Sequence, residues 1–116
     1  MLPPENRPQN RREILTIRKK GTLFSSSSFG LLIFKKELPD SPRFAFIIST
    51  KIHQKSSKRN RVRRLLSEAI ITLLPKIKPN ISCLFLAKKT ILNANLQDLK
   101  KELKTAFQKT NLLTIS

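Results

Sequence analysis

The chain of 116 residues has only one cysteine and only one histidine. A single cysteine excludes an internal disulfide, and the apolar stretch 81–87 around Cys83 is typical of a small buried core residue. A structural zinc site needs about four cysteine, histidine or carboxylate ligands brought together. The sequence therefore excludes a zinc-type site and predicts no metal held by the protein.

Acidic residues are also scarce, because only seven aspartates and glutamates occur and none of them forms an obvious pair. The one histidine, His53, lies in a polar stretch. Hydrolysis by general acid–base catalysis needs proton-transfer groups held close together. The sequence therefore offers no credible catalytic site of its own.

Long hydrophobic runs are absent as well. No apolar segment approaches the roughly 18 residues of a membrane span, and no basic-then-apolar signal peptide begins the sequence. The first residues are polar and rich in proline instead. These features predict a cytoplasmic protein with no membrane partner.

Positive charge is what the chain has in excess. It carries 24 lysines and arginines against seven acids, which gives a formal charge of +17 and a pI near 11.1. Self-repulsion of this size opposes folding unless anions offset it. With a membrane disfavoured, nucleic acid is the predicted polyanionic partner.

The densest charge lies between Lys58 and Arg64, where five of seven residues are cations. Apolar residues at helical spacing begin inside this run: Val62, Leu65, Leu66, Ala69, Ile70 and Leu73. The pattern predicts a helix up to about residue 74, with Ser56 or Ser57 as its N-cap. The cations, together with Ser67, are expected on the outer face of this helix.

A second helix is predicted near the start of the chain. Asn10 and Glu13 resemble a capping box, which favours a helix over residues 11–20 that ends at Gly21. The expected apolar side of this helix consists of Ile14, Leu15 and Ile17.

Three apolar segments are expected to be extended. The first covers residues 24–34 and includes four serines, the second covers 43–49, and the third covers 81–87. The first two are expected to pair as a hairpin, and Asn95 caps a last helix over about 96–107. The order is α-β-β-α-β-α. The predicted fold class is α+β, one small domain whose mixed, mainly antiparallel sheet packs with helices.

The basic helix carries a specific motif. Residues 59–65 read Arg-Asn-Arg-Val-Arg-Arg-Leu and are followed three residues later by Glu-Ala, which resembles the Arg-Asn-Arg signature of bacterial ribonuclease P protein components. The segment 43–51 resembles the family's strand before that signature, at a matching distance. Gly21, the strand at 84–89 and the last predicted helix also lie where the family has their equivalents.

The resemblance covers about residues 7–112 and implies a particular architecture. It divides the chain into a flexible N-terminal lead over 1–7, an RNA-binding domain over 8–112 and a tail over 113–116. It also implies a four-stranded sheet with a left-handed βαβ crossover, which is the rare hand for such a connection.

The resemblance further implies a function. Members of the family are the non-catalytic protein subunit of the endonuclease that removes the 5′ leader from precursor tRNA. The implied partners are the catalytic RNA subunit and precursor tRNA, with no small-molecule substrate. The implied chemistry depends on Mg²⁺ held by the RNA. No cofactor bound by the protein is implied.

In the family, the signature helix and the loop before it face the RNA subunit. Carried over by position, the RNA-binding residues are Lys51, Lys58, Arg59, Asn60, Arg61, Arg63 and Arg64. Arginine suits this role because its planar fork grips phosphate oxygens in pairs. Other roles stay open: the stem of Arg59 or Arg63 could pack at the apolar border, and Asn60 could cap the helix.

The family holds the single-stranded leader in a cleft between the first helix and the sheet. The candidates for this cleft are Ile14, Arg18, Phe24 and Phe46. The family tends to place aromatic residues where this chain has Ile14 and Arg18, so the resemblance predicts less base stacking here. A phenylalanine at position 24 or 46 is also typical of a core residue.

A different class of protein stays open at this point. A structural RNA-binding protein of the ribosome, or a general RNA chaperone, would share the charge, the size and the mixed fold. The Arg-Asn-Arg helix at a fixed distance after the strand at 43–49 favours the ribonuclease P interpretation. The βαβ order disfavours a DNA-binding helical module, because it presents no free recognition helix.

Overall fold

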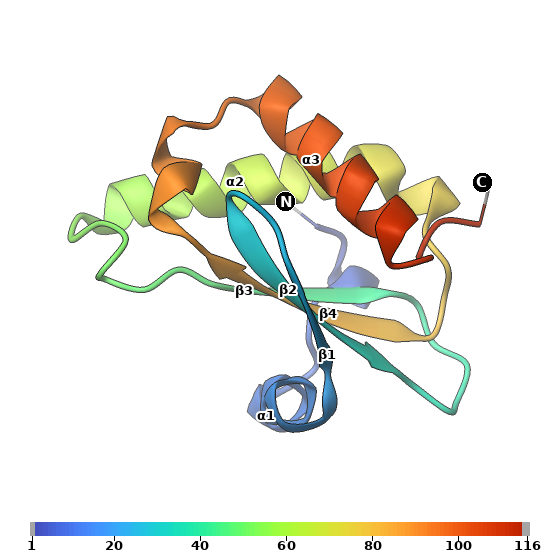
Figure 1. Ribbon diagram of the computed structural model, residues 1–116. Coiled ribbons are helices and arrows are strands. Elements are labelled where there is room, and N and C mark those ends of the chain that lie inside the picture. Colours follow the sequence, from blue (N-terminus) through green and yellow to red (C-terminus); the bar gives the residue numbers. More distant parts are fainter. Residues whose placement is uncertain (1, 115–116) are drawn as a thin grey trace.

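Helices cover both faces of a four-stranded sheet (Figure 1). In the computed structural model, which describes residues 2–114, α2 and α3 lie on one face and α1 lies against the other. The elements are α1 (Arg11–Lys20), β1 (Thr22–Ser25), β2 (Phe29–Lys35), β3 (Arg43–Ile47), α2 (Ser56–Leu73), β4 (Ile81–Ala87) and α3 (Leu96–Lys109). Short 3₁₀ turns occupy Pro4–Asn6, Leu74–Lys76 and Lys89–Asn93.

The sheet has the strand order β1-β2-β4-β3. β1 pairs with β2 and β2 with β4 in antiparallel fashion, whereas β3 runs parallel to β4. The predicted α+β class and the mixed, mainly antiparallel sheet are therefore confirmed. α2 provides the connection between the parallel strands β3 and β4, and the left-handed sense of this crossover stays a prediction.

The predicted hairpin between residues 24–34 and 43–49 is wrong. The hairpin is instead formed by β1 and β2, and β4 lies between β2 and β3. The serine segment is a turn rather than part of one long strand, and the Glu102 carboxylate on α3 accepts hydrogen bonds from the Ser26 hydroxyl and the Ser28 amide. Lys88 donates to the carbonyl of Ser26 from the other side, at 2.6 Å. These partners lie more than 60 residues away, so no local pattern indicates this turn.

The larger core lies between the sheet and the pair α2 and α3, and it is built around phenylalanine. The Phe85 ring lies 5.2 Å from Phe29, 5.7 Å from Phe46, 6.3 Å from Phe107 and 6.5 Å from Phe44, measured between centroids. Such tilted and edge-on pairs contribute beyond the apolar area they bury. Cys83 is also fully buried in this core, as predicted, and burial raises the pKa of its thiol well above the ordinary range.

The smaller core lies under α1 on the opposite face of the sheet. Ile17 of α1 is buried there with Ala45 and Leu84. Leu15, predicted on the apolar side of α1, is 55% exposed on the outer face, so that assignment is wrong. β3 contributes to both cores: Phe44 belongs to the larger one and Ala45 to the smaller one, which confirms a strand covered on both sides.

The ends of α1 follow local signals closely. The Asn10 side chain accepts a hydrogen bond from the Glu13 amide at 3.0 Å, and Glu13 in turn accepts one from the Gln9 amide at 2.8 Å. At the other end the Gly21 amide bonds to the Ile17 carbonyl, and a Cβ at position 21 would lie 2.5 Å from that oxygen. The predicted limits of the helix, 11–20, are confirmed.

The segment before α1 packs against the domain. Leu2 lies in the larger core at 3% exposure, although the sequence predicts a flexible lead over residues 1–7. The Asn6 side chain donates to the Pro42 carbonyl, and Arg43 donates to the Arg7 carbonyl, each at 2.7 Å. The division into lead, domain and tail stays a prediction, and residues 115–116 of the tail lie outside the described residues.

None of the helices over residues 2–114 is both long and apolar enough to cross a bilayer.

A cluster of charges joins the loop between β2 and β3 to the sheet. The Asp40 carboxylate contacts Lys36 Nζ at 2.8 Å and Arg43 Nε at 2.9 Å. The hydrogen bond from Arg43, followed by the one from Lys36, holds the pKa of Asp40 well below its ordinary value. Because Arg43 also binds the Arg7 carbonyl, this cluster ties the first residues of the chain to β3.

We expect Asp40→Asn to lower the stability of the protein at neutral pH, and by a smaller amount as the pH falls below about 4. A carboxylate with a lowered folded-state pKa stabilises the fold above its unfolded-state pKa, near 4, and loses this effect as the pH falls toward the folded-state value. Since the Asp40 side chain is still 30% exposed, the loss at pH 7 should be only about 1 kcal/mol. Urea unfolding followed by circular dichroism at pH 7 and pH 3 measures it.

The control for this experiment is Glu37→Gln, which removes an exposed carboxylate from the same loop. It accounts for the general effect of adding one net charge to a basic protein. If both variants are destabilised equally at pH 7, the pairing of Asp40 with Arg43 and Lys36 contributes nothing specific.

Candidate nucleic-acid interface

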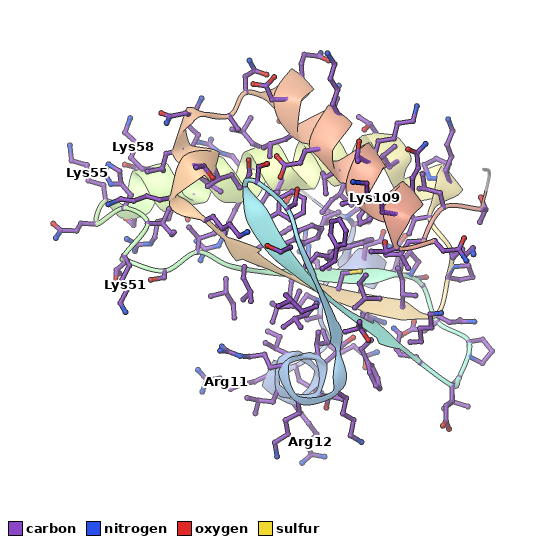
Figure 2. All side chains as sticks on the ribbon, viewed as in Figure 1. Arg11, Arg12, Lys51, Lys55, Lys58 and Lys109 are labelled. Atoms are coloured by element: carbon purple, nitrogen blue, oxygen red, sulfur yellow. The ribbon has the colours of Figure 1, made fainter. Side chains whose placement is uncertain are left out.

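Most of the positive charge has no partner within the protein. All 24 lysines and arginines lie in the described residues, and only Lys36 and Arg43 lie within 4.0 Å of a carboxylate there. The other 22 make no ion pair there, and those that form hydrogen bonds do so with backbone carbonyls or neutral side chains, as Lys88 does with Ser25. Figure 2 shows Lys51, Lys55 and Lys58 projecting from the loop after β3 and from the start of α2, at one end of the molecule.

The start of α2 concentrates this charge. Its N-cap is Lys55, whose side chain makes no capping hydrogen bond, and the first turn contains no acid. The predicted cap at Ser56 or Ser57 is wrong, because the Lys55 carbonyl already accepts from the amides of Lys58 and Arg59 at 3.2 Å. Cations near a helix N-terminus interact unfavourably with the helix dipole. An anion bound at this end would therefore offset both the repulsion among the cations and their unfavourable interaction with the helix dipole.

The predicted RNA-binding residues lie along the first half of α2 and the loop before it. The exposed ones are Lys51, Lys58, Asn60, Arg61, Arg63 and Arg64, whereas Arg59 is half-buried. Arg59 Nη1 donates to the carbonyls of His53 and Gln54, at 2.9 Å and 2.7 Å. Asn60 is not a cap, because it lies inside the helix and its Oδ1 accepts from Arg63 Nη1 at 3.0 Å.

A groove of about 860 Å³ runs along β3, the last strand at one edge of the sheet. We call it the β3 groove. Its lining residues are Leu2, Arg7, Pro8, Ile14, Phe44, Ala45, Phe46, Ser57, Asn60, Arg63, Arg64 and Ser67. The strand and α1 supply an apolar floor, while α2 supplies a wall with two guanidinium groups and an amide. This arrangement can bind flat apolar groups and anions together.

The four cleft candidates do not all lie in this groove. Ile14 and Phe46 both line it, next to Arg63 and Arg64 of the signature helix. Arg18 is exposed on α1 and is not among the lining residues. The structure does not bring Phe24 there either: it packs against the larger core and lines a second cavity of about 710 Å³, between the serine turn and α3.

Sequence reasoning missed several residues of the groove. Arg7 is held there by its own hydrogen bond to the Leu2 carbonyl at 2.7 Å, a contact that no sequence pattern indicates. Ser67 was expected on the outer face but is only 6% exposed, because that side of α2 faces the groove and the N-terminal segment. Outside the groove, Lys55 at the start of α2 could have been found, since it extends the cationic run by three residues toward the N-terminus.

The groove contains none of the usual groups for proton transfer or metal binding. Its described lining includes no carboxylate, histidine or cysteine. Within residues 2–114, no three such side chains come together as metal ligands would. His53 lies in the loop before α2, where its Nδ1 accepts from the Lys55 amide at 3.1 Å. The groove can hold and orient a ligand, but its own residues supply no acid–base pair.

Comparisons with known proteins agree on one family. The sequence model of the family described as Ribonuclease P matches residues 2–111. The chain is 30% identical over 118 residues to the ribonuclease P protein component of a Synechococcus species, covering 97% of this chain and 87% of that protein. It is 31% identical over 97 residues to that of Clostridioides difficile, covering 83% of each.

Solved structures show the same fold. The RNase P protein of Staphylococcus aureus superposes with a TM-score of 0.82 at 16% identity, covering 92% of this chain and 96% of that one. The RNase P protein from Thermotoga maritima gives 0.78 at 20% identity, covering 89% and 96%.

We expect anions to stabilise the free protein beyond simple screening. At about 0.01 M salt the Debye length of roughly 30 Å exceeds the 13.2 Å radius of gyration, so most cations repel one another. Sulfate bound only by the compact state should raise the melting temperature by roughly 5–10 °C over chloride at equal ionic strength. Thermal melting by circular dichroism in 10 mM buffer, with each salt, measures this. Equal melting in sulfate and chloride would show that anion binding is not coupled to folding.

Proposed function

Because the chain belongs to the ribonuclease P protein family, the protein component of the enzyme that matures tRNA 5′ ends, we propose that it binds the catalytic RNA subunit and the 5′ leader of precursor tRNA. The RNA subunit then carries out the hydrolysis. The family match over residues 2–111 decides against a ribosomal protein or a general RNA chaperone. The proposed compartment is the cytoplasm, because both proposed partners are RNAs.

The proposed contact with the RNA subunit involves the start of α2 and the loop before it. Its residues are Lys51, Lys58, Asn60, Arg61, Arg63 and Arg64, all of them exposed. The absence of an acid from the first turn of α2 supports this role, because only an external anion can offset the charge there. Phosphates of a folded RNA are anions with the spacing and number that such a surface requires.

The proposed leader site is the β3 groove, and one observation carries it. Its lining combines the apolar side chains of Ile14 and Phe46 with the guanidinium groups of Arg63 and Arg64. A single-stranded nucleic acid has flat apolar bases and charged phosphates, so it can contact the apolar floor and the arginines of the α2 wall at once. Phe46 is the aromatic side chain best suited to stack on a base, since Ile14 offers only an aliphatic surface.

The protein's part in the reaction is to hold and orient RNA. No lining residue of the groove can transfer a proton at neutral pH in the manner of a general base. Magnesium ions held by the RNA subunit supply the metal chemistry of hydrolysis. The guanidinium groups of this chain bring leader and RNA subunit together by neutralising phosphates, which reduces the magnesium needed for their association.

We expect the isolated protein to show no cleavage of precursor tRNA above background. When it is added to a cognate catalytic RNA, release of the 5′ leader should reach half its maximal rate at a lower magnesium concentration, because the protein cations replace part of the screening. Gel analysis of labelled precursor across a magnesium series measures both effects. Leader release by RNA-free protein would show that the active site lies in this chain after all.

We expect the affinity for the RNA subunit to depend steeply on salt. If about five cations contact phosphates, log K should fall against log salt with a slope of roughly −4. Arg61→Ala and Arg64→Ala should each flatten this slope by about one unit, because each loses one phosphate contact. Filter binding at several salt concentrations measures the slopes.

Lys104→Ala provides the matched control for these variants. Lys104 is an exposed cation on α3, which does not line the β3 groove. It changes the net charge by the same amount and should alter the slope by only a few tenths. If it flattens the slope as much as Arg61→Ala does, the affinity reflects net charge alone and the proposed surface is incorrect.

A further inference from the structure

The loop between β3 and α2 presents two of the exposed cations, Lys51 and Lys55. Its first half is anchored locally: the Ser49 hydroxyl accepts from the Lys51 amide and the Ser49 carbonyl from the Ile52 amide, each at 2.9 Å. Ile52 is half-buried against the larger core. The second half, residues 53–55, has no such anchor in the sheet, so its shape depends on other contacts.

Those contacts come largely from Arg59. Its Nη1 donates to both the His53 and the Gln54 carbonyl, at 2.9 Å and 2.7 Å, and the guanidinium thereby reaches back across the first turn of α2. The other hydrogen bonds of residues 53–55 are local: the Lys55 amide donates to the His53 ring, and the Lys55 carbonyl accepts from the first amides of α2. Within the described residues, no other side chain of α2 donates a hydrogen bond to this loop.

Arg59 thus differs from the other cations of its helix. Arg61, Arg63 and Arg64 are exposed, whereas Arg59 is half-buried and bonded to two backbone oxygens. Hydrogen bonds from a charged donor are stronger than neutral ones, and two of them fix both the position and the plane of the guanidinium. Its Nη1 is thus engaged before any RNA arrives, while within the described residues no hydrogen bond is made by its Nε or Nη2.

We propose that Arg59 is a positioning residue. It promotes RNA binding by holding residues 53–55 so that Lys51 and Lys55 face the same phosphates. It makes no phosphate contact of its own. The proposal rests on the proposed function, since it concerns how the same surface binds RNA. An interface gains affinity when its side chains are ordered beforehand, because less conformational entropy is lost on binding. Loss of the two Arg59 hydrogen bonds, which we call the brace, would leave the charges of Lys51 and Lys55 present but the distance between them variable.

The substitution Arg59→Lys separates the two roles. Lysine keeps the positive charge, but its ammonium lies one bond nearer the backbone than Arg59 Nη1 and has no fixed plane, so we expect it not to reproduce both hydrogen bonds to the loop carbonyls. If Arg59 is a positioning residue, Arg59→Lys and Arg59→Gln should weaken binding to the RNA subunit similarly, by roughly fivefold or more. For a phosphate contact, Arg59→Lys should keep the salt slope of the wild type while Arg59→Gln flattens it by about one unit.

Arg61 is the matched direct contact two residues along the same helix. Arg61→Gln should flatten the salt slope by about one unit, and Arg61→Lys should restore it. A second arm combines Arg59→Lys with Lys51→Ala and Lys55→Ala. If Arg59 acts through the loop lysines, its substitution should cost little in their absence, so the effects will not add.

A third measurement needs no RNA. Hydrogen exchange of the amides of residues 53–55 in the free protein should accelerate in Arg59→Lys and Arg59→Gln but not in Arg61→Gln. Unchanged exchange, or wild-type binding and slope in Arg59→Lys, would overturn the proposal. If exchange accelerates while none of the Lys51, Lys55, Arg61 and Arg64 variants affects RNA binding, the brace exists but the proposed RNA surface itself is wrong.

Discussion

A small aromatic core has to hold together a chain whose like charges repel. Phe85 contacts four other phenylalanine rings, and one of them, Phe107, packs α3 onto the sheet. Against this stands a net charge of +17 with ion pairs at only two of 24 cations in the described residues. Apolar burial and dispersion therefore carry nearly all the stability, and electrostatics oppose it until an anion binds.

Three of the seven carboxylates have a structural role in the described residues. Glu102 fixes the turn between β1 and β2, Asp40 ties the following loop to Arg43, and Glu13 bonds to Ser82 while it caps α1. Each holds two parts of the chain together, and none lines the β3 groove. The α2 side of the groove stays positively charged because no carboxylate of the described residues lines it.

Local sequence signals predicted those parts of the fold that local contacts determine. Asn10, Glu13 and Gly21 gave the limits of α1, and the apolar stripe from Val62 gave the core face of α2. The β1–β2 hairpin was missed because its turn depends on Glu102, a partner 74 residues from Ser28. In the same way, the motif identified the exposed arginines of the candidate interface, but Arg7 and Ser67 join the groove only through tertiary packing.

The position of β3 has a consequence for the order in which the molecule assembles. β3 forms the floor of the groove, yet within residues 2–114 its only strand partner is β4. The paired residues of β4 lie 39 positions further along the chain, as in Arg43 opposite Ser82. Closing a loop of this length is a slow, entropically costly step. During synthesis the β1–β2 hairpin can form early, whereas the groove floor has no place in the sheet until β4 has emerged from the ribosome. The surface proposed to bind RNA is thus completed late, after the scaffold that it belongs to.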